Sequence, residues 1–221
     1  MKIKISQTIQ LNYEVTGTGP NVILLHGNGE DLHIFDALVS RLKASFTVYA
    51  VDSRDHGKST QTNEPFNYND LTEDIHLFIQ KLQLEEVTIL GFSDGGIIAL
   101  LLGIRQERYL RKLISLSPNL SPKDWKKAPL MKIQERYRET KDPMFHMMLN
   151  EPNIDPKELK NIVVPTLITA GEHDLFYRSM YRTIEKRIPE AELQILKGED
   201  HSSYIIDTDK MAEAFRSFIL R

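Results

Sequence analysis

The sequence predicts an α/β fold in which helices cover both faces of a doubly wound sheet. Strand-like runs of apolar or β-branched residues alternate with helix-like segments along the chain, and this alternation is typical of right-handed crossovers between parallel strands. Several of the strand-like runs are apolar throughout, as strands buried on both faces require. A chain of 221 residues fits one large domain with a small insertion better than two independent domains.

Eight strand-like runs form the framework of this prediction. The first two, at residues 2–8 and 10–16, are expected to pair in antiparallel fashion. The other six are VILLH (22–26), FTVYAVD (46–52), VTILGF (87–92), KLISLS (112–117), PTLITAG (165–171) and ELQIL (192–196).

Helix-like segments fill most gaps between these runs. Apolar residues recur at helical spacing in five of them, at 31–45, 68–84, 94–109, 176–189 and 207–221. Asp31, Asn69 and Asp207 are expected as caps or first-turn residues, because short polar side chains accept hydrogen bonds from the free N–H groups of a helix start.

One stretch breaks the alternation and predicts a short helical cap at residues 118–160 within a single domain of residues 1–221. It contains no strand pattern, six prolines and two helical pieces near 124–139 and 143–150. Trp125, Leu130, Met131 and Ile133 are expected to point inward from the first piece. Seven Lys or Arg residues against three Asp or Glu residues at 121–141 make the cap locally basic.

Composition excludes several classes of function. The chain has no cysteine, so disulfides, thiolate metal sites and a cysteine nucleophile are excluded. A net charge of -3, from 28 basic and 31 acidic residues, argues against nucleic acid as a partner. The amino terminus alternates polar and apolar residues, and the longest apolar run spans only residues 97–102. We therefore expect a cytoplasmic protein with no membrane partner.

The most informative motif is Gly91-Phe92-Ser93-Asp94-Gly95-Gly96, which follows a strand-like run and opens a helix-like one. In the G-x-S-x-G elbow the serine occupies a strained turn, and the glycines leave room where strand and helix cross. No G-x-x-x-x-G-K-[ST] phosphate loop is present. The motif predicts that Ser93 is a nucleophile.

A serine nucleophile needs a base and an acid that orients the base, and on this fold the expected chain order is Ser, Asp, His. His201, in the loop before the last helix, is the predicted base, and Asp174, after the strand at 165–171, is the predicted orienting acid. The alternatives for the acid are Glu172, Asp200 and Asp124. His146 and His173 also follow Ser93 but are expected in packing and solvent-exposed roles.

The other site residues follow from the same chemistry. The oxyanion is expected to bind the backbone N–H groups of Asn28 and Asp94, since one donor usually follows the nucleophile and another comes from an early loop. His26 suits a brace for that loop, and Arg54 with a carboxylate suits a turn. The histidines show no paired ligand spacing, so no metal is expected. The expected substrate contacts are Phe92, Trp125, Phe145 and Met148.

Five motifs in order, HGNGE, DSRDHGKS, GFSDGG, PTLITAGEHD and GEDH, make the chain resemble the α/β-hydrolase superfamily over essentially its whole length. The resemblance implies an eight-stranded, mostly parallel sheet, a Ser-His-Asp mechanism without a cofactor and a cap inserted after the sixth strand. Asp55 departs from the family pattern, because many relatives have glycine at that position of the turn.

Asp94 supports two interpretations. The SDGG elbow is similar to that of valacyclovir-hydrolase-like esterases, which cleave activated amino-acid esters, and there a carboxylate can pair with an ammonium group of the substrate. An Asp in the first turn of a helix is also stabilised by the helix dipole, by about 0.3 to 1 kcal/mol, without any ligand. The basic cap points in the opposite direction, toward an anionic substrate, so the acyl group stays open.

The expected function is therefore hydrolysis of a small carboxylic ester or lactone through an acyl-enzyme on Ser93. The alternatives on the same triad are enol-lactone opening, carbon-carbon bond hydrolysis, perhydrolysis and a lyase step. A slow-turnover small-molecule receptor or signalling regulator of the same fold is a further alternative, since fold does not determine function. No protein partner is indicated by the sequence.

Overall fold

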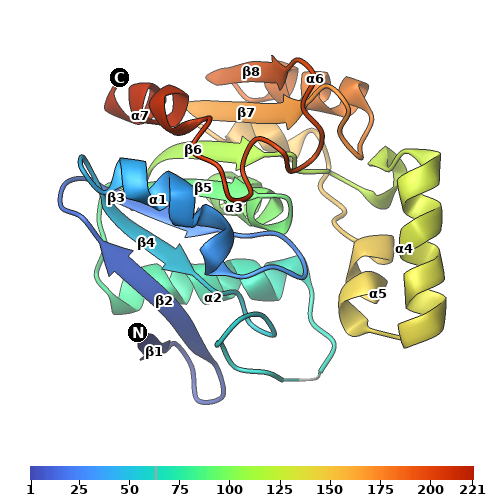
Figure 1. Ribbon diagram of the computed structural model, residues 1–221, viewed down its shortest axis with the longest axis horizontal. Helices are drawn as coiled ribbons and strands as arrows, with labels where there is room; N and C mark the ends of the chain where they lie inside the picture. The colour runs from blue at the N-terminus through green and yellow to red at the C-terminus, as the bar shows by residue number, and fades with distance from the viewer. Residues whose placement is uncertain (63) are drawn as a thin grey trace.

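An eight-stranded sheet forms the centre of the computed structural model, which describes residues 1–62 and 64–221 (Figure 1). The first two strands are antiparallel to their neighbours and the remaining six run parallel to one another. Across the sheet the order is β1 (Lys2–Lys4), β2 (Gln10–Thr16), β4 (Thr47–Val51), β3 (Asn21–Leu25), β5 (Val87–Phe92), β6 (Leu110–Leu116), β7 (Thr166–Gly171) and β8 (Ala191–Leu196). The predicted mostly parallel α/β sheet is confirmed.

Helices cover both faces of this sheet (Figure 1). Side chains of alternate strand residues point to opposite faces, so Val22 and Leu24 belong to one apolar cluster while Ile23 and Leu25 belong to the other. The first cluster includes residues of α1 (Asp36–Leu42) and α7 (Ala212–Leu220). The second includes residues of α2 (Tyr68–Lys81), α3 (Asp94–Ile104) and α6 (Arg178–Arg187).

Several predicted helix ends were wrong. The α2 cap is Asn67, which forms a reciprocal capping box with Asp70, while Asn69 lies in the first turn of α2, one of the two places predicted for it. Helix α3 ends at Ile104 instead of running to residue 109, because Gln106 adopts a left-handed φ of 56°. Asp207 also has a positive φ, of 50°, and α7 begins only at residue 212. Asp31 was predicted correctly, since its side chain caps the short 3₁₀ helix η1 (Leu32–Phe35).

Residues 117–165 leave the sheet between β6 and β7, and we call them the β6–β7 segment. They include the short 3₁₀ turns η2 (Pro122–Asp124) and η3 (Glu158–Asn161) and the helices α4 (Lys127–Thr140) and α5 (Pro143–Asn150). Helix α4 packs against α5 at one end of the molecule (Figure 1) and has no buried residue. The division into one domain and a cap stays a prediction.

The predicted inward-facing residues of the β6–β7 segment separate into two groups. Trp125 is buried, and Leu130 and Ile133 are half-buried against the core. Met131 is 57% exposed, so its predicted inward orientation was wrong. The reason is geometric: α4 rests on α5 along one face only, and Met131 lies outside that face.

Helices of the described part of the chain are all too short or too polar to cross a lipid bilayer. The parallel strands end at one common edge of the sheet, where the loops after β3, β5, β7 and β8 meet. These loops contain the residues that the motifs indicated.

Candidate active site

Ser93 stands in the strained turn that the elbow motif predicted. Its φ of 53° and ψ of -111° lie outside the regions that most residues adopt. A Cβ on Gly91 would lie 2.0 Å from the carbonyl oxygen of Gly95, and a Cβ on Gly95 would lie 2.2 Å from that of Leu25. Glycine is therefore required at both positions, because a side chain on Gly91 would separate strand β5 from helix α3, and one on Gly95 would separate α3 from strand β3.

His201 connects Ser93 to Asp174. The Nε2 atom of His201 lies 3.1 Å from Ser93 Oγ, and its Nδ1 atom lies 2.8 Å from Asp174 Oδ1. The three side chains come from the loops after β5, β7 and β8, and they are separated by up to 108 positions in the sequence. The structure thus brings together the three residues predicted to form the triad, in hydrogen-bond order.

The second oxygen of Asp174 is also bound. Ser117 Oγ donates a short hydrogen bond to Asp174 Oδ2 and lies 2.7 Å from the Tyr204 hydroxyl. Burial alone would raise the pKa of Asp174, but the hydrogen bonds from His201 and Ser117 outweigh burial and hold the pKa below its usual value. The carboxyl group is therefore ionised and fixed at both oxygens.

The other candidate acids bind elsewhere. Glu172, Asp200 and Asp124 each accept hydrogen bonds from backbone N–H groups in nearby loops: Gly198 for Glu172, Ser202 and Ser203 for Asp200, and Leu120 and Ser121 for Asp124. Asp174 is the carboxylate that contacts the His201 ring. The geometry accordingly favours Asp174 among the acids that the sequence left open.

Two backbone amides near Ser93 are free to bind an oxyanion. Among the described residues, the N–H groups of Asn28 and Asp94 donate to no other protein atom. A methyl group placed on Gly27 would lie 3.0 Å from Ser93 Cβ, so the loop that carries Asn28 packs directly against the serine. The side-chain Nδ2 of Asn28 is also buried without a partner.

Two histidines hold the loop after β3 against the loop after β4. His26 Nε2 accepts the Ser53 N–H at 3.0 Å, and its Nδ1 donates to the Gly27 carbonyl at 2.7 Å. His56 Nε2 accepts the Gly29 N–H at 3.0 Å. Burial, followed by the proximity of His56, lowers the pKa of His26 to about 4, so His26 is neutral. The predicted bracing role of His26 agrees with these bonds.

The charged turn after β4 is structural. Arg54 donates to both carboxylate oxygens of Asp74, at 2.5 and 2.6 Å. Asp55 adopts a φ of 59°, a left-handed conformation that glycine reaches at no steric cost. Its carboxylate accepts hydrogen bonds from the backbone N–H and the hydroxyl of Thr62. Asp55, the residue that departs from the family pattern, therefore takes part in the hydrogen bonds of this turn.

Asp94 is buried, and one of its oxygens already has a partner. The Tyr68 hydroxyl donates to Asp94 Oδ1 at 2.8 Å, while Oδ2 is buried without a hydrogen-bond partner. Burial raises the pKa of Asp94 despite the bond from Tyr68. The sequence did not indicate Tyr68, because the residue lies at the start of α2, 26 positions before Asp94.

Aromatic side chains border His201. The ring of Phe92 lies 5.1 Å from the His201 ring, and that of Phe176 lies 5.6 Å from it. Trp125 packs edge-on against Phe176 at 4.6 Å, and its Nε1 is buried without a partner. Phe92 and Phe176 therefore lie beside His201, and Trp125 lies behind Phe176. Substrate contact by Phe92 and Trp125 stays a prediction, and the sequence analysis missed Phe176.

The two predicted substrate contacts on α5, Phe145 and Met148, have different neighbours. Phe145 is half-buried below the Arg136 guanidinium of α4, which lies 6.0 Å from its ring centre. Met148 is half-buried and packs against the apolar cluster that includes residues of α2, α3 and α6. Substrate contact by either side chain stays a prediction.

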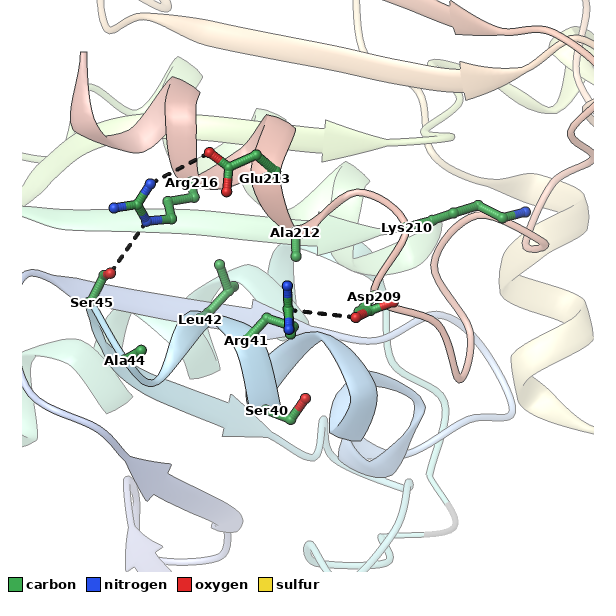
Figure 2. A pocket seen from close by; sticks show the side chains of 10 residues that line it. All are labelled: Ser40, Arg41, Leu42, Ala44, Ser45, Asp209, Lys210, Ala212, Glu213 and Arg216. Carbon is green, nitrogen blue, oxygen red and sulfur yellow. Dashed lines mark hydrogen bonds and ion pairs between the residues drawn. The ribbon is translucent and has the colours of Figure 1, made fainter.

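A separate surface groove of about 450 Å³ lies between α1 and α7 (Figure 2). Its cations are paired: Arg41 with Asp209 at 3.5 Å, and Arg216 with Glu213 at 3.4 Å. The groove contains no triad residue. Within the part of the chain that the structure describes, no cluster of side chains is suited to hold a metal ion.

Known proteins are similar to this chain in sequence and in fold. YraK of Bacillus subtilis (strain 168), an uncharacterized hydrolase, is 31% identical over 112 residues, which are 50% of this chain and only 41% of that protein. Serine hydrolase BPHL of Homo sapiens is 26% identical over 243 residues, covering 94% of this chain and 83% of BPHL. The esterase EaEST from Exiguobacterium antarcticum superposes with a TM-score of 0.84 at 21% identity, over 96% of both chains.

A family model for the alpha/beta hydrolase fold matches residues 20–146, which is more than half of the chain. The matched region includes the loop with Asn28, the braced turn after β4 and the elbow with Ser93. Together with the sheet order and the elbow geometry, this match shows that the chain belongs to the alpha/beta hydrolase fold family.

Proposed function

We propose that the protein is a serine hydrolase that cleaves a small carboxylic ester or lactone through an acyl-enzyme on Ser93. The observation that carries the proposal is the continuous contact from Ser93 Oγ through the His201 ring to Asp174 Oδ1, at 3.1 and 2.8 Å. A serine hydroxyl is a weak nucleophile at neutral pH and needs such a base.

The first half of the reaction forms the acyl-enzyme. Neutral His201 accepts the Ser93 proton at Nε2 while Nδ1–H donates to Asp174, whose negative charge stabilises the imidazolium. Ser93 Oγ attacks the ester carbonyl, and the N–H groups of Asn28 and Asp94 bind the oxyanion that forms. His201 then gives its proton to the departing alcohol oxygen.

Water completes the cycle. His201 accepts a proton from a water molecule, which attacks the acyl carbon, and the same two amides stabilise the second oxyanion. The proton returns from His201 to Ser93 Oγ as the carboxylic acid leaves. No step needs a metal or a cofactor, because the base, the nucleophile and the oxyanion donors all belong to this chain.

The comparisons support this proposal at the level of reaction class. BPHL is described as a serine hydrolase and EaEST as an esterase. Both cover most of the present chain, yet identity is 26% or lower. The fold admits other chemistry on the same triad, so the ester or lactone has to be tested directly.

The decisive experiment is pre-steady-state hydrolysis of p-nitrophenyl acetate by the wild type and Ser93→Ala. We expect a burst of p-nitrophenol close to one equivalent in the wild type, and loss of the burst with at least a 10³-fold lower kcat in the variant. A fluorophosphonate probe should label the wild type and spare the variant. A wild type that shows neither burst nor labelling would overturn the proposal.

Asp94 directs the proposal toward esters with a cationic or neutral acyl group. Its Oδ2 atom is buried and unpaired next to the nucleophile, whereas Oδ1 is held by Tyr68. We expect an α-amino ester to have a higher kcat/KM than its des-amino analogue, and Asp94→Asn to reduce that ratio about tenfold, through KM. Equal ratios in both proteins would leave Asp94 with a structural role only.

A further inference from the structure

Two side chains hold the turn that presents the Asn28 amide. The N–H of Gly27 donates to Glu30 Oε2 at 2.9 Å, and the N–H of Gly29 donates to His56 Nε2 at 3.0 Å. The free Asn28 N–H therefore lies between two peptide groups whose orientations are fixed by side-chain acceptors. A change in either acceptor would change the direction of the amide that faces the oxyanion.

Glu30 lies next to the nucleophile as well as to the turn. A methyl group placed on Gly27 would lie 2.9 Å from Glu30 Oε2 and 3.0 Å from Ser93 Cβ, so the carboxyl group and the serine border the same small space. His56, by contrast, comes from the loop after β4 and packs against His26, with ring centres 5.0 Å apart. Glu30 is thus the acceptor of the turn nearest the reacting atoms.

The surroundings make Glu30 titratable near neutral pH. Burial raises the pKa of Glu30 to about 7, although the bond from Gly27 opposes the rise. The charged groups that face it are His201 from the loop after β8, Asp94 from the start of α3 and Asp31 from its own loop. His201 lowers the pKa and the two carboxylates raise it.

This carboxyl group destabilises the folded protein above the usual pKa of a glutamate. The unfolded chain releases the Glu30 proton near pH 4.5 and the folded chain near pH 7, so folding stability falls as the pH rises through that interval. A neutral acceptor such as glutamine would hold Gly27 without this penalty. The presence of an ionisable group here is therefore not explained by stability.

We propose that Glu30 is a positioning residue that orients the Asn28 amide for the oxyanion through its hydrogen bond to Gly27, and that its ionisation couples this orientation to pH. The inference rests on the proposed acyl transfer by Ser93. A carboxylate accepts an N–H more strongly than a neutral carboxyl group does. Activity should accordingly fall as the pH drops through about 7.

Two substitutions separate acceptance of the hydrogen bond from charge. Glu30→Gln keeps an oxygen for the Gly27 N–H and cannot ionise, while Glu30→Met has similar length and no acceptor oxygen. With p-nitrophenyl acetate we expect Glu30→Met to lower kcat about tenfold with KM unchanged within about twofold, since misplacing an oxyanion donor affects the transition state. Glu30→Gln should keep kcat within about threefold and lose the pH step near 7.

Thermal unfolding supplies a second readout that does not depend on turnover. Glu30→Gln should raise Tm relative to the wild type at pH 8 and leave it unchanged at pH 4. The wild type has a buried, ionised carboxylate at pH 8 and a neutral carboxyl group at pH 4, whereas glutamine is neutral at both. Asp155→Leu is the matched control: Asp155 is exposed and its carboxylate also accepts a backbone N–H, from Lys157 at 2.9 Å. This control should keep kcat within about twofold at every pH.

The outcomes distinguish this inference from the proposed function. If Ser93→Ala retains activity and no burst appears, the acyl-enzyme itself is wrong. If Ser93 is required and Glu30→Met keeps the wild-type kcat, the positioning role is wrong. An equal loss of kcat in Glu30→Gln and Glu30→Met would also overturn it, because the loss would then follow the charge and not the hydrogen bond.

Discussion

The carboxyl edge of the sheet and helix α4 are built in opposite ways. At the edge, Asp174 is buried and bound at both oxygens, and the neighbouring loops are tied together by His26 and His56. Helix α4 has no buried residue and packs on α5 at the end of the molecule (Figure 1). The residues of the proposed chemistry are therefore held by many contacts, and α4 is held by few.

This difference indicates where sequence changes matter. Displacing a group at the edge breaks buried hydrogen bonds and alters the distances on which the proposed reaction depends. A surface change on α4 breaks few contacts and leaves the triad in place.

The largest effect should follow Asp174→Asn. An amide cannot hold the His201 tautomer that accepts the Ser93 proton, so kcat should fall about 10⁴-fold. Burst kinetics with p-nitrophenyl acetate measure the loss, and circular dichroism checks the fold. Glu172→Gln serves as the control, because the Glu172 carboxylate accepts the Gly198 N–H and does not bind His201. A loss under tenfold in Asp174→Asn would show that the edge is not organised around this carboxylate.

The second-largest effect should be a loss of folding stability at low pH. His26 is buried and neutral, with a pKa lowered from 6.5 to about 4. In the unfolded chain it binds a proton near pH 6.5, and in the folded chain only near pH 4. The free energy of unfolding should therefore fall by about 3 kcal/mol as the pH drops through this window.

Urea unfolding of the wild type and His26→Gln between these two pH values measures the contribution of His26 to the free energy of unfolding. Glutamine does not titrate, so the part of the pH dependence that comes from His26 should disappear in the variant. A wild type and variant with parallel stability curves would contradict the assignment of His26 as the acid-sensitive brace of the edge.

The smallest effect is expected on α4. Met131 is 57% exposed, so Met131→Ala should change the free energy of unfolding by less than about 0.5 kcal/mol. Leu113, on β6, is fully buried, and Leu113→Ala should cost about 3 kcal/mol. Denaturant titration compares the two. A large loss in Met131→Ala would mean that α4 has a buried face, and the contrast between the two regions would be lost.

Most of the fold could be predicted from local patterns. Strand β5 was predicted at its observed bounds and the other parallel strands to within two residues at either end, because continuous apolar runs mark buried parallel strands. Helix ends were predicted less well. Gln106 and Asp207 adopt a positive φ, and nothing in the local apolar spacing indicates that.

The candidate site was also predicted only in part. The motifs placed Ser93, Asp174 and His201 correctly at one edge, since each follows a strand of the predicted sheet. The partners that fix them were missed, because Ser117 lies 57 positions from Asp174 and Tyr204 lies 87 positions from Ser117. Ser117 directly follows β6, and that position at the edge was the one available signal.

By itself the sequence determined the α/β class, the order of the motifs and the identity of the three residues that meet in hydrogen-bond contact, because short-range patterns carry that information. Only the tertiary structure decided which oxygen of Asp174 meets His201, which oxygen of Asp94 is left unpaired and that Glu30 lies beside Ser93. Those facts depend on how distant loops pack at one edge of the sheet. Burial and charge there then set the protonation of each group.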